Sequence, residues 1–293
     1  MYAGTEFYGI NEIFMNYAGI PSYIPLPVAV QHGWQYQPTT FEIDSKPPEI
    51  WVWSKRMAEL YSQAFPEFRV RITGSSFCYL YDELKKVEPI VGRKGSIVIP
   101  NHSTHHIGVK YSAEEYAELL YNLDEKYKPI SVLLYYLDLN KDTVSAYTKY
   151  GFDIRCNGSL FDSNFLVNFI NNVNDKEYCI APGDFGSGVF YAMYMGLKPH
   201  QLGSLSSYHG LDIVFKNDIT RIKSYENDEL GLRKKINNNL TLDMVKQELG
   251  VEYLLSKDEL RKIIFNNYTP KVVYTLLKRK IYWQFVHEKE KKY

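Results

Sequence analysis

The chain has 293 residues, of which 45% are hydrophobic and 23% are charged, as in an ordinary globular protein. Its 34 Lys and Arg balance its 34 Asp and Glu, so we expect no nucleic-acid partner. The three cysteines are widely spaced, and no run reaches the roughly 18 apolar residues of a spanning helix. The N-terminus also lacks a signal-peptide pattern, so we expect a reducing, cytoplasmic location.

The first third of the sequence predicts a strand, helix, strand unit. Short β-rich runs cover residues 28–34, 49–54 and 68–76, and residues 55–65 have helical apolar spacing. This order is typical of a parallel sheet. We expect an N-terminal α/β lobe over residues 1–90, ending in a Gly- and Lys-bearing linker.

Strands and helices alternate regularly in the middle of the chain. Four β-rich runs begin at residues 96, 129, 152 and 177, and expected helices at 112–126, 142–150, 163–172 and 187–195 separate or follow them. This alternation predicts a Rossmann-like nucleotide-binding lobe over residues 91–215, followed by a helical C-terminal extension over residues 216–293. Ligands of such sheets bind beyond the carboxyl ends of the strands.

The strongest candidate site is the turn between the last of these strands and its helix. The strand ends at Asp184, and the turn Gly186, Ser187, Gly188 opens the helix. Free N–H groups and the helix dipole at such a turn favour a phosphate group. Glycines in tight turns can also serve a purely steric purpose, and this alternative stays open.

A second candidate follows the strand that opens the Rossmann-like lobe. The loop contains Asn101, His102, Ser103, Thr104 and His105. Hydroxyl and imidazole groups can bind a diphosphate, although an ordinary polar surface loop has the same composition. The adjacent His105 and His106 point in different directions and have no neighbouring carboxylate or Cys, so we expect neither a metal nor a cofactor.

His32 ends the first strand of the N-terminal lobe, where it could act as a general base or as a structural residue. Other candidate acids or bases are Glu6, Glu12, Asp44 and Asp138. The sequence contains no G-x-S-x-G elbow, Walker P-loop or paired Cys ligand pattern. The serine hydrolase, NTPase and zinc-ribbon classes are therefore not expected.

The runs VAVQHGW, GSIVIPNHSTHHI, KPISVLLYYLDL and YCIAPGDFGSGVFYAMYMGLK resemble bacterial surface-polysaccharide biosynthesis proteins with a GT-B-like glycosyltransferase fold. They are more distantly similar to GT-B enzymes that use CMP- or CDP-activated donors. The resemblance matches His32 to the N-lobe HG position, His102 and Ser103 to the C-lobe His loop, and Gly186 with Ser187 to the phosphate turn. The chain departs from that pattern in its His-Ser pair, its single turn Ser and its short N-terminal lobe.

The resemblance implies two Rossmann-like lobes, the N-terminal one reduced and on the acceptor side. It also implies a metal-independent glycosyltransferase of capsule or lipopolysaccharide biosynthesis. Its expected partners are a nucleotide-sugar donor and a glycan or lipid-linked acceptor, with His32 as the catalytic residue. The alternatives are a sugar-nucleotide epimerase or hydrolase on the same scaffold, and a non-catalytic nucleotide-sugar-binding protein.

The C-terminal stretch TLLKRKIYWQFVHEKEKKY combines basic residues with Tyr282, Trp283 and Phe285. This composition is typical of a helix at a membrane surface. It also suits a solvated terminal helix, because Glu288 and Glu290 dilute its charge. A peripheral contact at the inner face of the membrane is therefore one of two interpretations.

Overall fold

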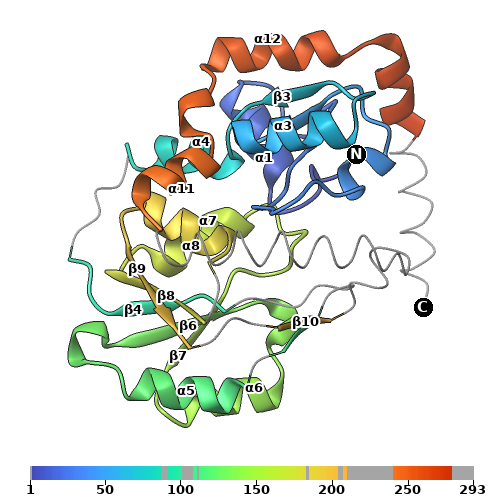
Figure 1. Cartoon of the computed structure of the whole chain (residues 1–293). Helices are drawn as coiled ribbons and strands as arrows, with labels where there is room; N and C mark the ends of the chain where they lie inside the picture. Colours follow the sequence, from blue (N-terminus) through green and yellow to red (C-terminus); the bar gives the residue numbers. More distant parts are fainter. Residues whose placement is uncertain are drawn as a thin grey trace. The chain divides into compact units, whose positions relative to one another are not determined.

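The computed structural model describes residues 2–86, 92–100, 108–110, 112–182, 185–203, 207–209 and 240–278. The chain divides into two compact α/β units, each built on a parallel sheet (Figure 1). Unit 1 comprises Met1–Asp82, Phe161–Ser163 and Gln247–Tyr293, and unit 2 comprises Glu83–Leu160 and Asn164–Lys246. Within the described ranges, no helix is long and apolar enough to cross a membrane.

Unit 1 holds the strands β1 (Ala29–Val30), β2 (Ile50–Val52) and β3 (Val70–Ile72). Its helices are α1 (Ile10–Tyr17), α2 (Phe41–Asp44), α3 (Lys55–Ala64), most of α4 (Ser76–Leu84) and α12 (Lys257–Asn267), and residues 270–278 are also helical. A short 3-10 helix covers Val251–Tyr253.

Unit 2 holds the strands β4 (Ser96–Val98), β6 (Ile130–Leu134), β7 (Asp153–Cys156), β8 (Tyr178–Pro182) and β9 (Lys198–Leu202). A separate antiparallel pair joins β5 (Gly108–Lys110) to β10 (Ser207–His209). The helices are α5 (Ala113–Tyr121), α6 (Lys141–Thr148), α7 (Phe165–Val173) and α8 (Ser187–Tyr194), with 3-10 turns at Glu125–Tyr127 and Tyr136–Asp138. Helix α11 (Leu242–Glu248) contains the boundary between the units.

The five strands of the unit 2 sheet are parallel and follow the order β7-β6-β4-β8-β9. The first strand of the sheet lies at its centre, the next two extend to one side and the last two to the other, which is a Rossmann-like order. The predicted alternation is confirmed, with one more strand than expected. The sequence of β9, KPHQL, has no apolar run, because this edge strand is only partly buried.

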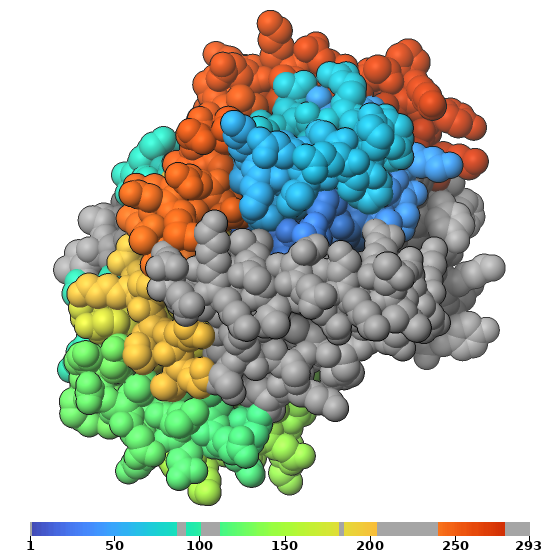
Figure 2. Space-filling view, in the orientation of Figure 1, coloured from blue at the N-terminus to red at the C-terminus, as the bar shows by residue number. Residues whose placement is uncertain are grey.

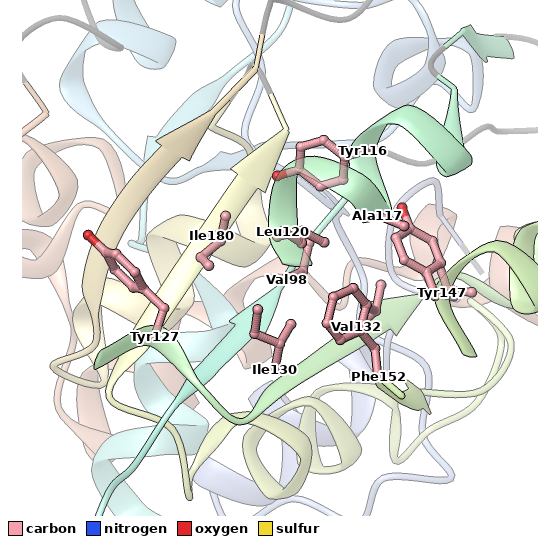
Figure 3. Close-up of a cluster of buried hydrophobic side chains, with 11 residues drawn as sticks. Val98, Tyr116, Ala117, Leu120, Tyr127, Ile130, Val132, Tyr147, Phe152 and Ile180 are labelled. Atoms are coloured by element: carbon pink, nitrogen blue, oxygen red, sulfur yellow. The ribbon is translucent and has the colours of Figure 1, made fainter. Parts of the chain in front are cut away.

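Helices cover both faces of this sheet, α5 and α6 on one side and α7 and α8 on the other (Figure 1). Alternate strand residues such as Val132 and Ile180 pack with Leu120 of α5 and Tyr147 of α6 in one buried cluster (Figure 3). The predicted start of α5 is also confirmed, because the Ser112 side chain accepts a hydrogen bond from a backbone N–H in the first turn.

Unit 1 has a smaller sheet of three parallel strands in the order β1-β2-β3. Ile50 and Val52 point to α3, where they pack with Met57 in a buried cluster. Between them Trp51 points to the other face, where its ring meets Phe14 of α1 at a centroid distance of 5.5 Å.

Helix α12 and the helical residues 270–278 belong to unit 1, whereas we expected residues 216–293 to form a separate helical extension. Leu260 and Ile264 of α12 are buried, and the amide of Asn267 donates to the buried carboxylate of Glu49 at 2.9 Å. Figure 2 shows the orange and red atoms of residues 257–278 against the blue and cyan atoms of unit 1. The unit boundary also falls after Asp82, before the expected linker.

The three cysteines, Cys78, Cys156 and Cys179, are free thiols. Cys78 and Cys179 are buried, and Cys156 is half-buried at the end of β7.

We expect Leu120→Ala to lower the free energy of unfolding by about 2 to 5 kcal/mol, because it opens a cavity beneath α5. The matched control is Leu119→Ala, since Leu119 lies on the same helix but is exposed. It should change stability by no more than about 0.5 kcal/mol. Urea denaturation followed by circular dichroism measures both, and equal losses would contradict the described packing.

Candidate functional site

The carboxyl end of β1 is tied to the strand beside it through Gln31, which is fully buried. The N–H of Gln31 donates to the carbonyl of Trp51 at 2.9 Å, and its side-chain oxygen accepts from the N–H of Trp53 at 3.0 Å. The indole of Trp53 donates in turn to the Gln31 carbonyl at 2.9 Å. These bonds set the point at which the chain leaves the sheet, and the next residue is His32.

His32 forms a hydrogen-bonded pair with Glu42, a residue of the short helix α2. Nδ1 of His32 lies 3.2 Å from Oε1 of Glu42, and the His32 side chain is 27% exposed while the Glu42 side chain is fully buried. A histidine with one ring nitrogen on a buried carboxylate and its ring open to solvent is the arrangement of a general base with its orienting group.

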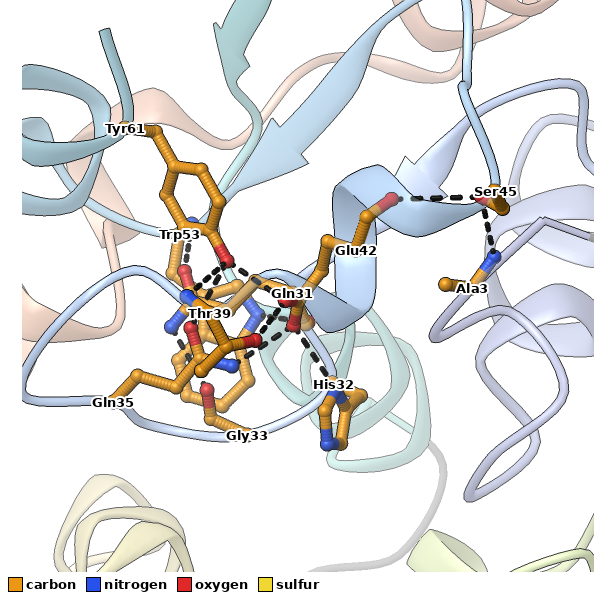
Figure 4. Close-up of polar contacts among 10 residues, drawn as sticks. All are labelled: Ala3, Gln31, His32, Gly33, Gln35, Thr39, Glu42, Ser45, Trp53 and Tyr61. Carbon is orange, nitrogen blue, oxygen red and sulfur yellow. Dashed lines mark hydrogen bonds and ion pairs between the residues drawn. The ribbon is translucent and has the colours of Figure 1, made fainter. Parts of the chain in front are cut away.

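The buried carboxylate of Glu42 accepts hydrogen bonds from three further side chains (Figure 4). Gln35 donates to Oε1 at 2.8 Å, Tyr61 donates to Oε2 at 2.8 Å, and Thr39 also donates to Oε2. Burial raises the pKa of Glu42, but the hydrogen bond and positive charge of His32, with the bonds from Thr39 and Gln35, outweigh it. The pKa therefore lies below its ordinary value, and Glu42 is ionised.

Burial and the adjacent Glu42 carboxylate raise the pKa of Tyr61 well above its ordinary range, so its hydroxyl keeps its proton and donates. An ionised carboxylate can only accept hydrogen bonds, so the proton between Glu42 and His32 resides on Nδ1. In the neutral form of the ring, Nε2 carries the lone pair. Among the described residues, no side chain or backbone group forms a hydrogen bond with Nε2.

The loop that supplies Gln35 and Thr39 is anchored by Arg56 of α3. Its guanidinium donates to the carbonyls of Gln35 and Tyr36 at 2.7 and 2.9 Å, and forms an ion pair with Glu248 at 2.7 Å. The indole of Trp34 donates to the same carboxylate at 2.6 Å. A planar guanidinium that makes several bonds at once fixes the loop geometry around Glu42.

The sequence makes His32 a candidate base but does not predict its hydrogen-bond partner. That partner is Glu42, two residues before the candidate Asp44. The signal that could have found Glu42 is its place between Phe41 and Ile43, because a charged residue in an apolar segment is buried only with partners.

In unit 2, the strand order reverses between β4 and β8, which pair in parallel. Such a switch point is where doubly wound sheets bind ligands, and both predicted phosphate-binding segments follow these two strands. The residues Asn101, His102, Ser103, Thr104, His105 and Asp184 lie outside the described part of the chain. The carboxyl ends of β4 and β8, after which the two predicted segments begin in the sequence, therefore lie at the same edge of the sheet.

The two glycines of the turn that opens α8 have different structural roles. A Cβ on Gly188 would lie 2.9 Å from Cγ2 of Ile99, so glycine here allows α8 to pack against the end of β4. Gly186, the N-cap residue, has φ −125° and ψ −170°, an extended conformation that any residue adopts. A steric explanation therefore accounts for Gly188, whereas the backbone conformation of Gly186 does not by itself require glycine.

No protein-family model matches the chain, and no curated protein sequence matches it. In the described ranges, no group of three or more His, Cys, Asp or Glu side chains could hold a metal ion. The basic aromatic stretch proposed for membrane contact lies mostly outside the described residues. A functional proposal therefore depends on the site geometry.

We expect ionised Glu42 to stabilise unit 1 in a pH-dependent manner. Its pKa is lowered from 4.5 in the folded state, so its contribution is complete above pH 4.5 and is lost as the pH falls through the folded-state pKa. Glu42→Gln should therefore lower stability at neutral pH and flatten the decline below pH 4.5. Urea denaturation over this pH range measures the effect.

The control is Glu59→Gln, because Glu59 is an exposed residue of α3. It should keep the wild-type pH profile. If Glu42→Gln also keeps that profile, Glu42 does not titrate with a lowered pKa.

Proposed function

We propose that the chain is a metal-independent glycosyltransferase of GT-B type, acting in bacterial cell-surface polysaccharide biosynthesis. The pairing of His32 with the buried, ionised Glu42 carries this proposal. We assign the candidate general base and acceptor binding to unit 1, and nucleotide-sugar binding to unit 2. The order of the motifs along the chain supports this assignment through its similarity to GT-B enzymes.

In the proposed step, Nε2 of His32 takes the proton of an acceptor hydroxyl as that oxygen attacks the anomeric carbon of the donor. A new C–O bond forms while the bond from the anomeric carbon to the nucleotide phosphate breaks, and the nucleotide leaves with the bonding electrons. The buried Glu42 stabilises the imidazolium that results. The proton then passes from the imidazolium to solvent or to the departing phosphate.

For unit 2, we propose that the edge at the β4–β8 switch point holds the donor diphosphate or phosphate. Gly186 and Ser187 would offer backbone N–H groups at the start of α8, and His102 and Ser103 would contribute from the loop after β4. Hydrogen-bond donors and a helix dipole can stabilise a leaving phosphate in place of a cation.

A sugar-nucleotide hydrolase is the second candidate, because the His32–Glu42 pair would deprotonate water as readily as an alcohol. The two functions differ in whether nucleotide release depends on an acceptor. Release at the same rate with and without a glycan acceptor would favour hydrolysis.

His32→Ala should lower turnover by about 10² to 10⁴ while leaving nucleotide affinity nearly unchanged, because general-base assistance acts on the chemical step. Glu42→Gln should also lower turnover, to a smaller extent, since it removes the group that orients the ring. The matched control is His200→Ala, a half-buried histidine of β9 whose Nδ1 lies 3.3 Å from the hydroxyl of Tyr127. Steady-state nucleotide release measures all three, and full turnover in a folded His32→Ala protein would remove the proposed mechanism.

Gly186→Val should weaken nucleotide binding by at least about tenfold, or 1.4 kcal/mol, because the added side chain blocks close approach of a phosphate. The backbone of Gly186 is extended, a conformation that valine adopts readily. Thermal stabilisation by a panel of CMP, CDP, UDP and GDP identifies the nucleotide and measures the loss. Unchanged affinity in a folded variant would exclude this turn from the site.

A further inference from the structure

Three aromatic side chains contact the ring of His32 in unit 1, and a fourth contacts one of the three; the set of Phe7, Tyr8, Phe41 and Phe161 is here called the aromatic cluster. The rings of Phe7 and Phe41 meet the His32 ring edge-on, at centroid distances of 5.3 and 5.2 Å, and stack on each other at 5.6 Å. Tyr8 lies nearly parallel to the His32 ring at 6.5 Å, and Phe161 meets Phe7 at 5.5 Å.

Two of these rings are more exposed than large apolar side chains usually are. Phe161 is 57% exposed and Phe41 is 39% exposed, on either side of the half-buried Phe7. Single exposed apolar residues are ordinary, but a contiguous aromatic patch beside a candidate base indicates a binding surface.

The backbone that carries the cluster is held in an unfavourable conformation. Tyr8 has φ +58°, a left-handed value that is uncommon for a bulky residue. At the next position, Gly9, a Cβ would lie 2.0 Å from the carbonyl oxygen of Ser163, so the loop is pressed against the segment that carries Phe161. Strain of this kind is retained mainly where it places functional side chains.

The chemistry around His32 selects a neutral ligand. Within the described residues, its ring contacts and its hydrogen bond are to Phe7, Tyr8, Phe41 and Glu42, which include no cation. Among these described contacts, the imidazole is the only group that could carry a positive charge toward a phosphate. A sugar ring has an apolar C–H face that suits an aromatic face, and hydroxyl groups that can donate to Nε2. An alkyl chain could pack against the aromatic rings, but it has no hydroxyl group that could donate a hydrogen bond to Nε2.

We infer that the aromatic cluster binds a pyranose ring of a glycan acceptor, stacked on Phe161 and Phe41, with one hydroxyl donating to Nε2 of His32. The identity of this ring as the acceptor rests on the proposed function. Binding of the sugar itself requires neither a nucleotide nor turnover, so it can be tested separately.

The test is saturation-transfer difference NMR on the full chain with methyl β-D-galactopyranoside, methyl β-D-glucopyranoside and methyl N-acetyl-β-D-glucosaminide as probes. At least one should bind, and Phe161→Ala should weaken its binding roughly tenfold, or about 1.4 kcal/mol. Phe161→Leu keeps apolar volume but removes the aromatic face, and should weaken binding as well. The matched control is Phe265→Ala, because Phe265 of α12 is also 57% exposed.

Three results would overturn the inference: no probe binds the wild-type protein, the Phe161 variants bind as tightly as Phe265→Ala, or n-octanol competes with the bound glycoside. The last result would identify a site for a lipid chain. A protein that binds a glycoside in a Phe161-dependent manner but shows no turnover would support this site while contradicting the proposed function.

Discussion

A buried carboxylate is the constraint on which the candidate site depends. An isolated ionised group in a protein interior is strongly unfavourable, so Glu42 can remain there only because four side chains compensate it. Each of those partners must itself be held in place, which explains the extended polar network at the end of β1. The hydrogen bond that His32 donates to the Glu42 carboxylate also fixes the orientation of the His32 ring.

The same requirement links elements that are far apart in the sequence. Arg56 holds the loop that carries Gln35, and Glu248 from α11 holds Arg56 and Trp34. In the sheet itself, the buried Glu49 bonds to Arg71, Trp51 and Asn267, which joins β2, β3 and α12. Unit 1 therefore combines a small parallel sheet with polar ties to C-terminal helices.

The sequence predicted the parallel strands of unit 2 well because their signals are local. The apolar run of β6 and the N-cap at Ser112 can each be recognised from neighbouring residues in the sequence alone. The order of strands and the return of α12 to unit 1 depend on long-range packing, which periodicity does not contain. For the site, the position of His32 after a strand makes it a candidate, whereas the pairing of Glu42 with His32 depends on donors that only the fold brings together (Figure 4).

The discontinuous course of unit 1 has a consequence for how the protein is made. Trp34 and its partner Glu248 are 214 residues apart in the chain. At a synthesis rate of about 5 to 20 residues per second, roughly 10 to 40 seconds separate their emergence from the ribosome. During that interval, Arg56 and Trp34 lack their common partner Glu248, while the strands and helices of unit 2 are already being synthesised. The nascent chain can thus complete the unit 2 sheet before the His32–Glu42 pair reaches its final geometry.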